Sequence, residues 1–439
     1  MRGEAIAIAP PLVSRPRIGI PFAEGAFLLV LLLVFVTLQP FATRDPAVLA
    51  ATGAGLGGAG DVVRQLAYLG ALALVSVAAL DKHGLRAMFS MSPSLALLLV
   101  WCGMSALWAT APDVVLRRVA LEFVIIASVA IGVSTVGGER SLALTRAVLA
   151  TVLVINWISI LTVQNAVHLP GETETQLVGD WRGLYYHKNI AGAVSAITAI
   201  LFFFRAMDTR RFAHWALFVA AVGFTIMTRS RSSLGILPFA LAAGCIYRAT
   251  WRRGIDRAIL CVFLLLGILA AAAWAGVDAG AISHAFEDPN QLTGRTAIWQ
   301  AELAFIHDHP LLGYGFGTFS DSGAVPPLHN YVADVWVQNE SHGHNAYLQL
   351  LVTVGGVGFL LALIALVAVP ARVLWRLDPR NLATKSALAS VFVFMVLHNF
   401  LESDFMEGDG PAWVAFLVTL AVLRQLNSAS RALTGSGTR

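Results

Sequence analysis

Long apolar runs recur along the whole chain, and they restrict its fold more than any other feature. Charge-poor stretches of 15 to 24 residues follow one another from end to end, and they include strings such as LLVLLLVFVTL and LCVFLLLGILAAAAWAG. About 20 apolar residues suffice for a helix to cross a bilayer. Transmembrane strands would show short alternating patterns instead of continuous runs. The sequence therefore predicts an all-α, polytopic membrane protein.

Composition excludes three other classes of protein. Hydrophobic residues make up 57% of the 439 residues and charged residues only 13%, whereas soluble domains have about 25% charged residues. The recurrence of the apolar runs also excludes a soluble enzyme held by one amphipathic anchor. A net charge of +4 is small for a nucleic-acid-binding protein, so no nucleic acid is expected as a partner.

We expect about twelve transmembrane helices, which form one integral membrane domain over residues 1–439. The first span follows a basic segment but is too long for the core of a signal peptide, so we expect it to be retained. All three cysteines lie within predicted spans, and a zinc site with cysteine spacing is therefore not expected. The predicted spans are about 20–42, 62–80, 93–109, 119–136, 146–166, 189–206, 213–228, 233–247, 257–276, 345–369, 385–402 and 410–424.

The distribution of basic residues predicts the orientation of these spans. Cytoplasmic loops of membrane proteins are enriched in Lys and Arg. With the amino terminus inside, 21 of the 30 basic residues lie on the inner side and nine on the outer side. We therefore expect both termini to be cytoplasmic.

Two long outer loops are expected to carry the function. They cover residues 167–188 and 278–343, and the second is a large periplasmic loop between the ninth and tenth spans. Long connections of this kind often carry functional residues. The large loop contains eight acidic residues and one basic residue, Arg295. Eight of the eleven histidines lie in or beside the two loops.

Two strings inside the large loop suggest local structure. GRTAIWQAELAFIHDHP predicts a helix whose apolar face contains Ile298, Trp299, Leu303 and Ile306, and we expect this helix to lie along the membrane surface. The following string, LLGYGFGTF, has alternate glycines that favour a tight turn with close backbone approach. The alternative interpretation of this second string is an ordinary packed turn.

The basic residues of the outer side are exceptions to the topology rule and need a reason. Arg182, Lys188, Arg231 and Arg295 could converge on one outward-facing pocket. Guanidinium groups suit a diphosphate because they donate bidentate hydrogen bonds and stay charged. We prefer Arg231 to Arg229 because two residues so close on a helical turn face different directions. The alternative is that each cation extends to the interface or pairs with acidic loop residues.

His344 is the candidate catalytic residue. In SHGHNAYLQLL it stands at the outer end of the tenth span, where the positive end of the helix dipole disfavours an imidazolium. A neutral imidazole can take a proton from a sugar hydroxyl. Asn345 beside it supports this role, and Glu402 or Asp404 could orient His344 or an arginine. The alternative is a histidine that only caps or packs.

Glu122 is a further acidic residue, located in the outer third of the fourth span. A carboxylate at the centre of a span would cost about 3 kcal/mol on insertion scales. Nearer the boundary the cost is smaller, so Glu122 could be a polar contact between helices.

Several strings together resemble a known family. RGLYYHKNIAG, the SRSSLG turn, GRTAIWQAEL followed by HPLLGYGFGTF, and HNAYLQLLVTVGGVG occur in that order around a long loop. From about residue 90 onward the chain is similar to the bacterial O-antigen ligase and polysaccharide polymerase superfamily, especially to exopolysaccharide polymerases of the succinoglycan type.

This resemblance implies a metal-independent, inverting glycosyltransferase that needs no cofactor. It would act at the periplasmic face of the bacterial inner membrane and transfer a glycan from undecaprenyl diphosphate to a saccharide or lipid-core acceptor. His344 would be the general base, Arg182 and Arg231 would bind the diphosphate, and Arg295 would assist the leaving group. Other implied partners are membrane lipids and further polysaccharide export proteins.

Two questions stay open at this point. A transporter or flippase of lipid-linked glycans also fits about twelve helices with both ends inside, although transporters place ionisable groups near mid-membrane and this chain places them at one face. A polymerase and a ligase use the same donor chemistry. The GLYYHKN string and the lack of an evident lipid-core docking feature favour a polymerase slightly.

Overall fold

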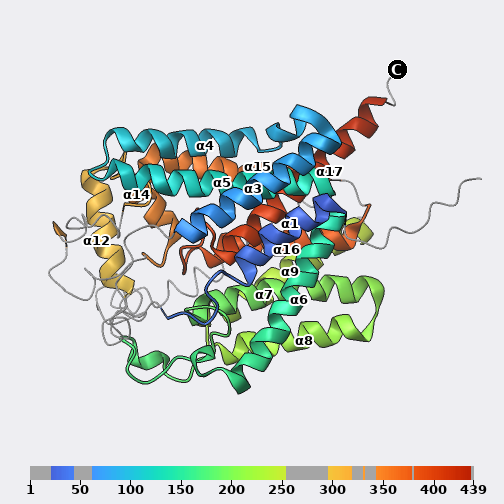
Figure 1. Ribbon diagram of the computed structural model, residues 1–439, viewed down its shortest axis with the longest axis horizontal. Coiled ribbons are helices and arrows are strands. Elements are labelled where there is room, and N and C mark those ends of the chain that lie inside the picture. Colours follow the sequence, from blue (N-terminus) through green and yellow to red (C-terminus); the bar gives the residue numbers. More distant parts are fainter. Residues whose placement is uncertain are drawn as a thin grey trace, which may run out of the picture.

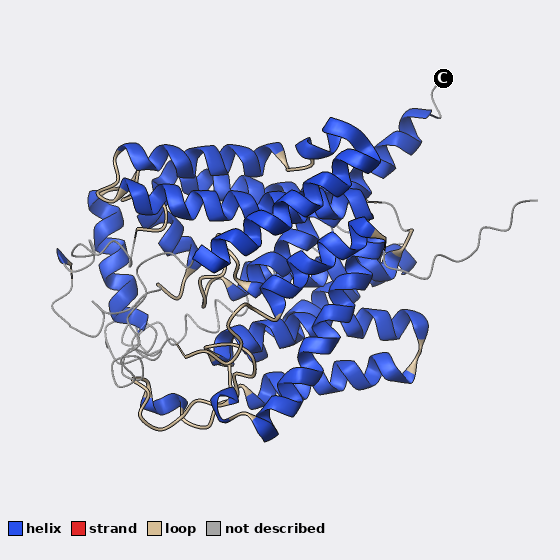
Figure 2. Cartoon of the chain, viewed as in Figure 1, coloured by secondary structure: helices blue, strands red, loops and turns tan. Residues whose placement is uncertain are grey.

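The computed structural model describes residues 21–43, 62–253, 295–318, 330–331, 343–377 and 380–436. Within these residues the chain forms helices and no β-strand, apart from one isolated bridge between Val167 and Trp181. Figure 2 shows this helical architecture with its connecting loops. The prediction of an all-α fold is confirmed.

Most of the helices in the described part of the chain form one bundle. Six are long and apolar enough to cross a bilayer, and four shorter apolar helices accompany them. The helices of the bundle are α1 (Phe22–Phe35), α3 (Val62–His83), α4 (Pro93–Met104), α5 (Pro112–Val136), α6 (Gly138–Thr162), α7 (Lys188–Thr209), α8 (Phe212–Met227), α9 (Arg231–Arg253), α14 (Ala346–Ala362), α15 (Val369–Arg376), α16 (Leu382–His398) and α17 (Pro411–Ser436). Helices α14 and α15 belong to one long span and are joined by a π-helical segment, Leu363–Ala368.

Each predicted span on described residues coincides with a helix, whereas the span at 257–276 lies outside the described residues. The predicted boundaries were less accurate. Helix α5 begins at Pro112 instead of 119, and α6 begins at Gly138 instead of 146. Both helices include arginines in these extra turns, because a charged residue near a helix end does not interrupt the backbone hydrogen bonds.

Helix α12 (Arg295–Asp308) lies across one end of the bundle, at the left in Figure 1. The rest of the predicted loop 278–343 is described only at 309–318, 330–331 and 343. The buried face of α12 includes Ile298, Trp299 and Phe305, as its pattern suggested in part. Leu303 was placed on that face wrongly, because it is 54% exposed while Glu302 beside it is buried.

The turn that follows α12 packs into a break in α14. Gly355 has a φ of 67° inside that helix, which interrupts the regular ladder. The amide of Gly356 donates to Pro310 O (2.8 Å), and those of Tyr314 and Gly315 donate to Val352 O (2.9 Å) and Thr353 O (2.8 Å). A Cβ at Gly355 would lie 2.1 Å from Leu311 O. The glycines of both strings therefore permit the close backbone approach that fixes α12 over the bundle.

The loop between α16 and α17 is attached to two other helices. Glu122, 1% exposed on α5, accepts hydrogen bonds from Gly408 N (2.6 Å) and Trp413 Nε1 (3.1 Å). Arg64 of α3 forms a bidentate ion pair with Asp409. Glu122 is thus a polar contact between helices, one of the roles considered for it, and it helps to hold the loop that carries Glu402.

Candidate active site

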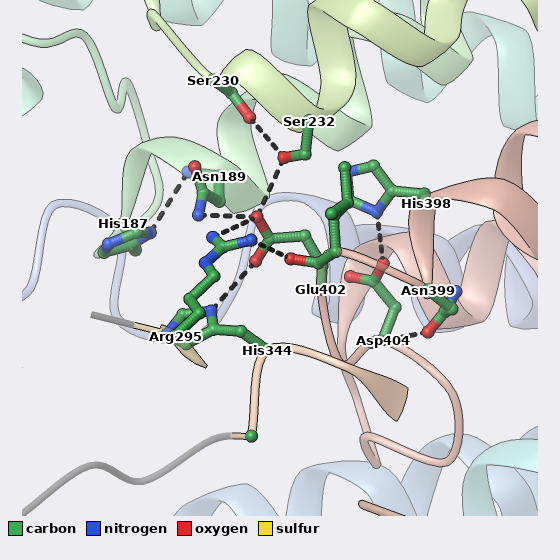
Figure 3. Close-up of polar contacts among 12 residues, drawn as sticks. His187, Asn189, Ser230, Ser232, Arg295, His344, His398, Asn399, Glu402 and Asp404 are labelled. Carbon is green, nitrogen blue, oxygen red and sulfur yellow. Dashed lines mark hydrogen bonds and ion pairs between the residues drawn. The ribbon is translucent and has the colours of Figure 1, made fainter. Parts of the chain in front are cut away.

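Glu402 is the centre of a polar cluster at the α12 end of the bundle. Its Oε1 atom accepts hydrogen bonds from Asn189 Nδ2 (2.9 Å), Ser232 Oγ (2.9 Å) and Arg295 Nη2 (3.0 Å). Its Oε2 atom lies 3.4 Å from His344 Nδ1. Figure 3 shows these contacts. We call these five residues the Glu402 cluster.

The cluster is assembled from helix starts that are distant in sequence. Asn189 and Ser232 are the second residues of α7 and α9, Arg295 is the first residue of α12, and His344 lies just before α14. Helix amino termini carry partial positive charge and unpaired N–H groups. Their convergence stabilises a buried carboxylate, and Glu402 has a side chain only 9% exposed.

Electrostatics keep Glu402 ionised. Burial alone would raise its pKa, but the hydrogen bond from His344 and the positive charge of Arg295 lower the pKa below the usual range. An ionised carboxylate only accepts hydrogen bonds. The Nδ1–H group of His344 is therefore the donor to Glu402, and in this tautomer the lone pair of a neutral ring lies on Nε2.

The backbone around His344 is held in an uncommon conformation. His344 has a φ of +48°, a region that few non-glycine residues occupy. Asn345 caps α14 by accepting hydrogen bonds from Tyr347 N (3.0 Å) and Leu348 N (3.1 Å). The indole of Trp299 donates to Gly343 O (2.9 Å). Such strained residues persist where the surrounding structure holds them, and they concentrate at functional sites.

Arg182 and Lys188 lie in a second group, which we call the Asp180 cluster. Arg182, 2% exposed, pairs with Glu172 (3.1 Å) and donates to Asn165 O (2.8 Å). Lys188 Nζ pairs with Asp180 (2.6 Å). The cluster consists of His168, Glu172, Asp180, Arg182, Lys188 and Arg229. The structure therefore separates these two predicted site residues from the contacts around Glu402.

Arg231 differs from the other predicted cations. It is exposed at the start of α9, and within the described ranges it has no ion-pair partner. Ser232, its neighbour, bonds Glu402. Arg229 is 71% exposed and pairs with Asp180 at 3.2 Å. Of the two arginines in this turn, Arg231 is the one adjacent to the Glu402 cluster and available to an anion.

Two residues of the Glu402 cluster, Asn189 and Ser232, were not singled out from the sequence. Asn189 and Ser232 were hidden inside the YYHKN and SRSS strings, whose polar content was their only signal. Asp404 was expected to orient His344 or an arginine, but it bonds His398 Nδ1 at 2.7 Å. His187 caps α7 by accepting from Asn189 N (3.2 Å), and burial lowers its pKa to about 3. His187 is therefore a neutral ring beside the cluster.

Comparison with known proteins identifies a domain in the second half of the chain. Residues 216–363 match the family model described as O-antigen ligase. This match supports the resemblance to the O-antigen ligase and polymerase superfamily. No curated protein matches it. The matched segment of this ligase-type chain contains Arg231, Ser232, Arg295 and His344, whereas Asn189 and Glu402 lie outside it.

The matched domain supports the general function expected from the sequence. The chain is a multi-pass membrane protein with an O-antigen ligase domain, which indicates a glycosyltransferase-like ligase or polymerase activity. The family indicates a lipid-linked glycan as donor and a saccharide as acceptor.

Proposed function

We propose that this protein transfers a glycan from undecaprenyl diphosphate to an acceptor hydroxyl at the periplasmic face of the bacterial inner membrane. Both termini would be cytoplasmic, and the α12 end of the bundle would face the periplasm. The observation that supports this proposal is the imidazole of His344, whose Nδ1 atom lies 3.4 Å from the ionised carboxylate of Glu402. The superfamily favours this enzyme over a transporter or flippase.

In the proposed reaction, His344 Nε2 takes the proton of the acceptor hydroxyl. The hydroxyl oxygen forms a bond to the anomeric carbon while the bond from that carbon to the diphosphate oxygen breaks. The electron pair leaves with undecaprenyl diphosphate, so direct attack inverts the anomeric centre. Glu402 stabilises the imidazolium that forms at His344, as a carboxylate does in other histidine-based sites.

The diphosphate requires cations near the cluster. Arg231 is our first candidate because it is exposed, lies beside Ser232 and has no ion-pair partner among the described residues. Arg295 is held by Glu402 and by the carbonyl of Leu401, and it would assist the leaving group from that fixed position. Arg182 and Lys188 are paired with carboxylates, so we propose that they shape the loop before α7 and act on the diphosphate only indirectly.

The acceptor decides between a polymerase and a ligase. A second repeat unit as acceptor would give a polymerase, and a lipid core would give a ligase. We favour a polymerase on the sequence features of the YYHKN segment. Deletion of the gene distinguishes the two, because a ligase mutant still makes long lipid-linked chains, whereas a polymerase mutant accumulates single lipid-linked repeat units.

The test of the proposed function is His344→Ala. Loss of a general base lowers turnover by a factor of about 10² to 10⁴, so we expect polymer or ligated glycan to disappear while lipid-linked donor accumulates. Membrane abundance should match that of the unmodified protein, because the side chain of His344 is 23% exposed and is not part of the packed core. Normal product from this variant would remove the general-base role.

A further inference from the structure

A second imidazole–carboxylate pair lies behind the Glu402 cluster. His398, the last residue of α16 and 1% exposed, has its Nδ1 atom 2.7 Å from Asp404 Oδ2. Its Nε2 atom lies 3.0 Å from Ser233 Oγ on α9. Both ring nitrogens are therefore occupied by protein groups, as Figure 3 shows for Asp404.

Three serine hydroxyls connect this pair to Glu402. Ser230 Oγ donates to Ser233 Oγ (3.1 Å) and lies 3.3 Å from Ser232 Oγ. Ser232 Oγ donates to Glu402 Oε1 (2.9 Å). Ser230 and Ser233 are fully buried and Ser232 is 7% exposed. The α8–α9 turn thus carries an unbroken line of polar contacts from one carboxylate to the other.

Hydrogen-bond directions show how this line acts. A carboxylate accepts, so Nδ1 of His398 donates to Asp404, while Nε2 contacts Ser233 Oγ. Each hydroxyl has one proton, and that of Ser230 is directed to Ser233 and that of Ser232 to Glu402. No proton is left for the contact between Ser230 and Ser232, so the line fixes the position of the turn and does not form one continuous hydrogen-bond chain.

The His398–Asp404 bond also closes the segment on which Glu402 lies. The two residues flank positions 399–403, and Asn399 Oδ1 accepts from Asp404 N and Phe405 N, both at 2.9 Å. Glu402 is therefore held from two sides. Its backbone is fixed by this closure, and its carboxylate is fixed by Ser232.

The geometry points to His398 and Asp404 as a positioning pair that acts through the serines of the α8–α9 turn to orient Glu402, and through Glu402 to orient His344. This inference rests on the proposed function. The arrangement has the order of a Ser–His–Asp triad, but the hydroxyl of Ser233 is fully buried, so it is a structural link and not a nucleophile.

The test is a double-mutant cycle between Ser233→Ala and Glu402→Gln in the full-length protein in membranes. The donor is the lipid fraction that accumulates in a strain from which the gene is deleted. We expect Ser233→Ala to lower kcat about fivefold, the effect of one hydrogen bond, with KM for the donor unchanged. In the Glu402→Gln background the same substitution should have no further effect, because coupled residues are not additive.

Ser390→Ala is the matched control. Ser390 is also fully buried between α16 and α9, where its Oγ atom donates to Ala240 O (2.5 Å), but it has no link to Glu402 in the described contacts. We expect this variant to keep the normal kcat in both backgrounds. His398→Gln, which retains a polar group for Ser233, should lose less kcat than His398→Leu.

The outcomes separate this inference from the proposed function. Suppose that Glu402→Gln has a lowered kcat and that adding Ser233→Ala lowers kcat further by the same factor as in the unmodified protein. Ser233 then acts independently of Glu402, which overturns the positioning role but leaves the proposed function intact. If Glu402→Gln has normal kcat, the role of Glu402 fails and the inference fails with it. No further loss on adding Ser233→Ala to an impaired Glu402→Gln supports the positioning pair.

Discussion

The Glu402 and Asp180 clusters contain the same kinds of groups but are built differently. Each has a buried carboxylate, at least one basic side chain and a histidine. The Asp180 cluster comes almost entirely from residues 168–188, with Arg229 as its only distant member. The Glu402 cluster takes one residue from each of five separate segments.

The two clusters also differ in how completely their charges are paired. Asp180 accepts from Lys188 and Arg229, while Glu172 pairs with His168 and Arg182. In the Glu402 cluster, one carboxylate serves several donors, and His344 has an uncommon backbone conformation. We therefore propose the Glu402 cluster, where distant helix starts converge, as the reactive centre, and we propose a structural role for the charged residues collected in one loop.

Arg182→Met should give the largest change, and it should affect stability. Removing one partner of a buried ion pair costs about 3 to 5 kcal/mol because the remaining charge is left unpaired. Glu172 would lose its cation and keep only the hydrogen bonds from His168 and Leu169 N. We expect a lower thermal unfolding temperature in detergent, with normal kcat for the fraction that stays folded. A raised KM for the donor at normal stability would instead show that Arg182 binds the diphosphate directly.

Glu402→Gln should have the next largest effect, and it should affect turnover. The substitution keeps the shape of the side chain but removes the charge that faces His344 and Arg295. Hydrogen bonds to charged groups contribute about 1.5 to 3 kcal/mol, so kcat should fall between about tenfold and a hundredfold. Asp180→Asn, the corresponding change in the other cluster, should leave kcat of the folded protein unchanged. Equal losses in both variants would contradict the distinction between the clusters.

Arg231→Lys should raise KM for the donor about tenfold, since lysine cannot make the bidentate contact of a guanidinium with phosphate. Arg229→Lys is the matched control two residues away. Arg229 is 71% exposed and paired with Asp180, and exposed ion pairs contribute little, so its KM should change less than twofold. The measurement is donor saturation in membranes, and identical KM values for the two variants would argue against Arg231 as the diphosphate ligand.

Glu302→Gln should give the smallest effect, visible as a change in pH dependence. Glu302 is fully buried, and neither carboxyl oxygen has a hydrogen-bond partner in the described structure. Burial raises its pKa well above the usual value. The folded state therefore retains a proton that the unfolded state releases near pH 4.3, so its contribution to stability decreases as pH rises above about 4.3.

Glu302→Gln should remove this decrease of stability with rising pH, because the glutamine side chain does not ionise. Unfolding temperatures measured from pH 5 to 9 should fall less steeply for Glu302→Gln than for the unmodified protein. Parallel curves would show that Glu302 is ionised in the folded state. Glu302 and Glu402 can be compared directly, because burial raises the pKa of both carboxyl groups. Of these two, only Glu402 has hydrogen-bond donors that lower its pKa again.

Much of the fold was predictable because helix periodicity and hydropathy are local. The spans that fall on described residues follow from continuous apolar runs, and α12 follows from its own pattern. The sequence did not predict that Glu302, and not Leu303, lies on the buried face of α12. A buried carboxyl contradicts the ordinary rule for helix faces, and its position depends on packing against the turn before α14 rather than on sequence spacing.

The candidate site was predictable only in part. His344, Arg295 and Glu402 were selected from strings and topology, and the structure brings these three together. Arg182 and Lys188 were selected for the same reason as Arg231, namely their charge on the outer side, yet they are paired within their own loop. Nothing in the sequence shows whether a cation already has a partner, because the partner can be eight or two hundred residues away.

By itself, the sequence determined that this chain is an all-helical membrane protein whose charged residues lie mainly in or near the connections between helices. That follows from the cost of placing charges and unpaired backbone groups in hydrocarbon. Only the tertiary structure decided which of those polar residues meet. The turn after α12 packs into the break at Gly355, and Arg295 at the start of α12 contacts Glu402. The starts of α7, α9 and α14 supply the remaining hydrogen-bond donors to Glu402. Long-range contacts between backbone segments, and not residue type, select the members of the site.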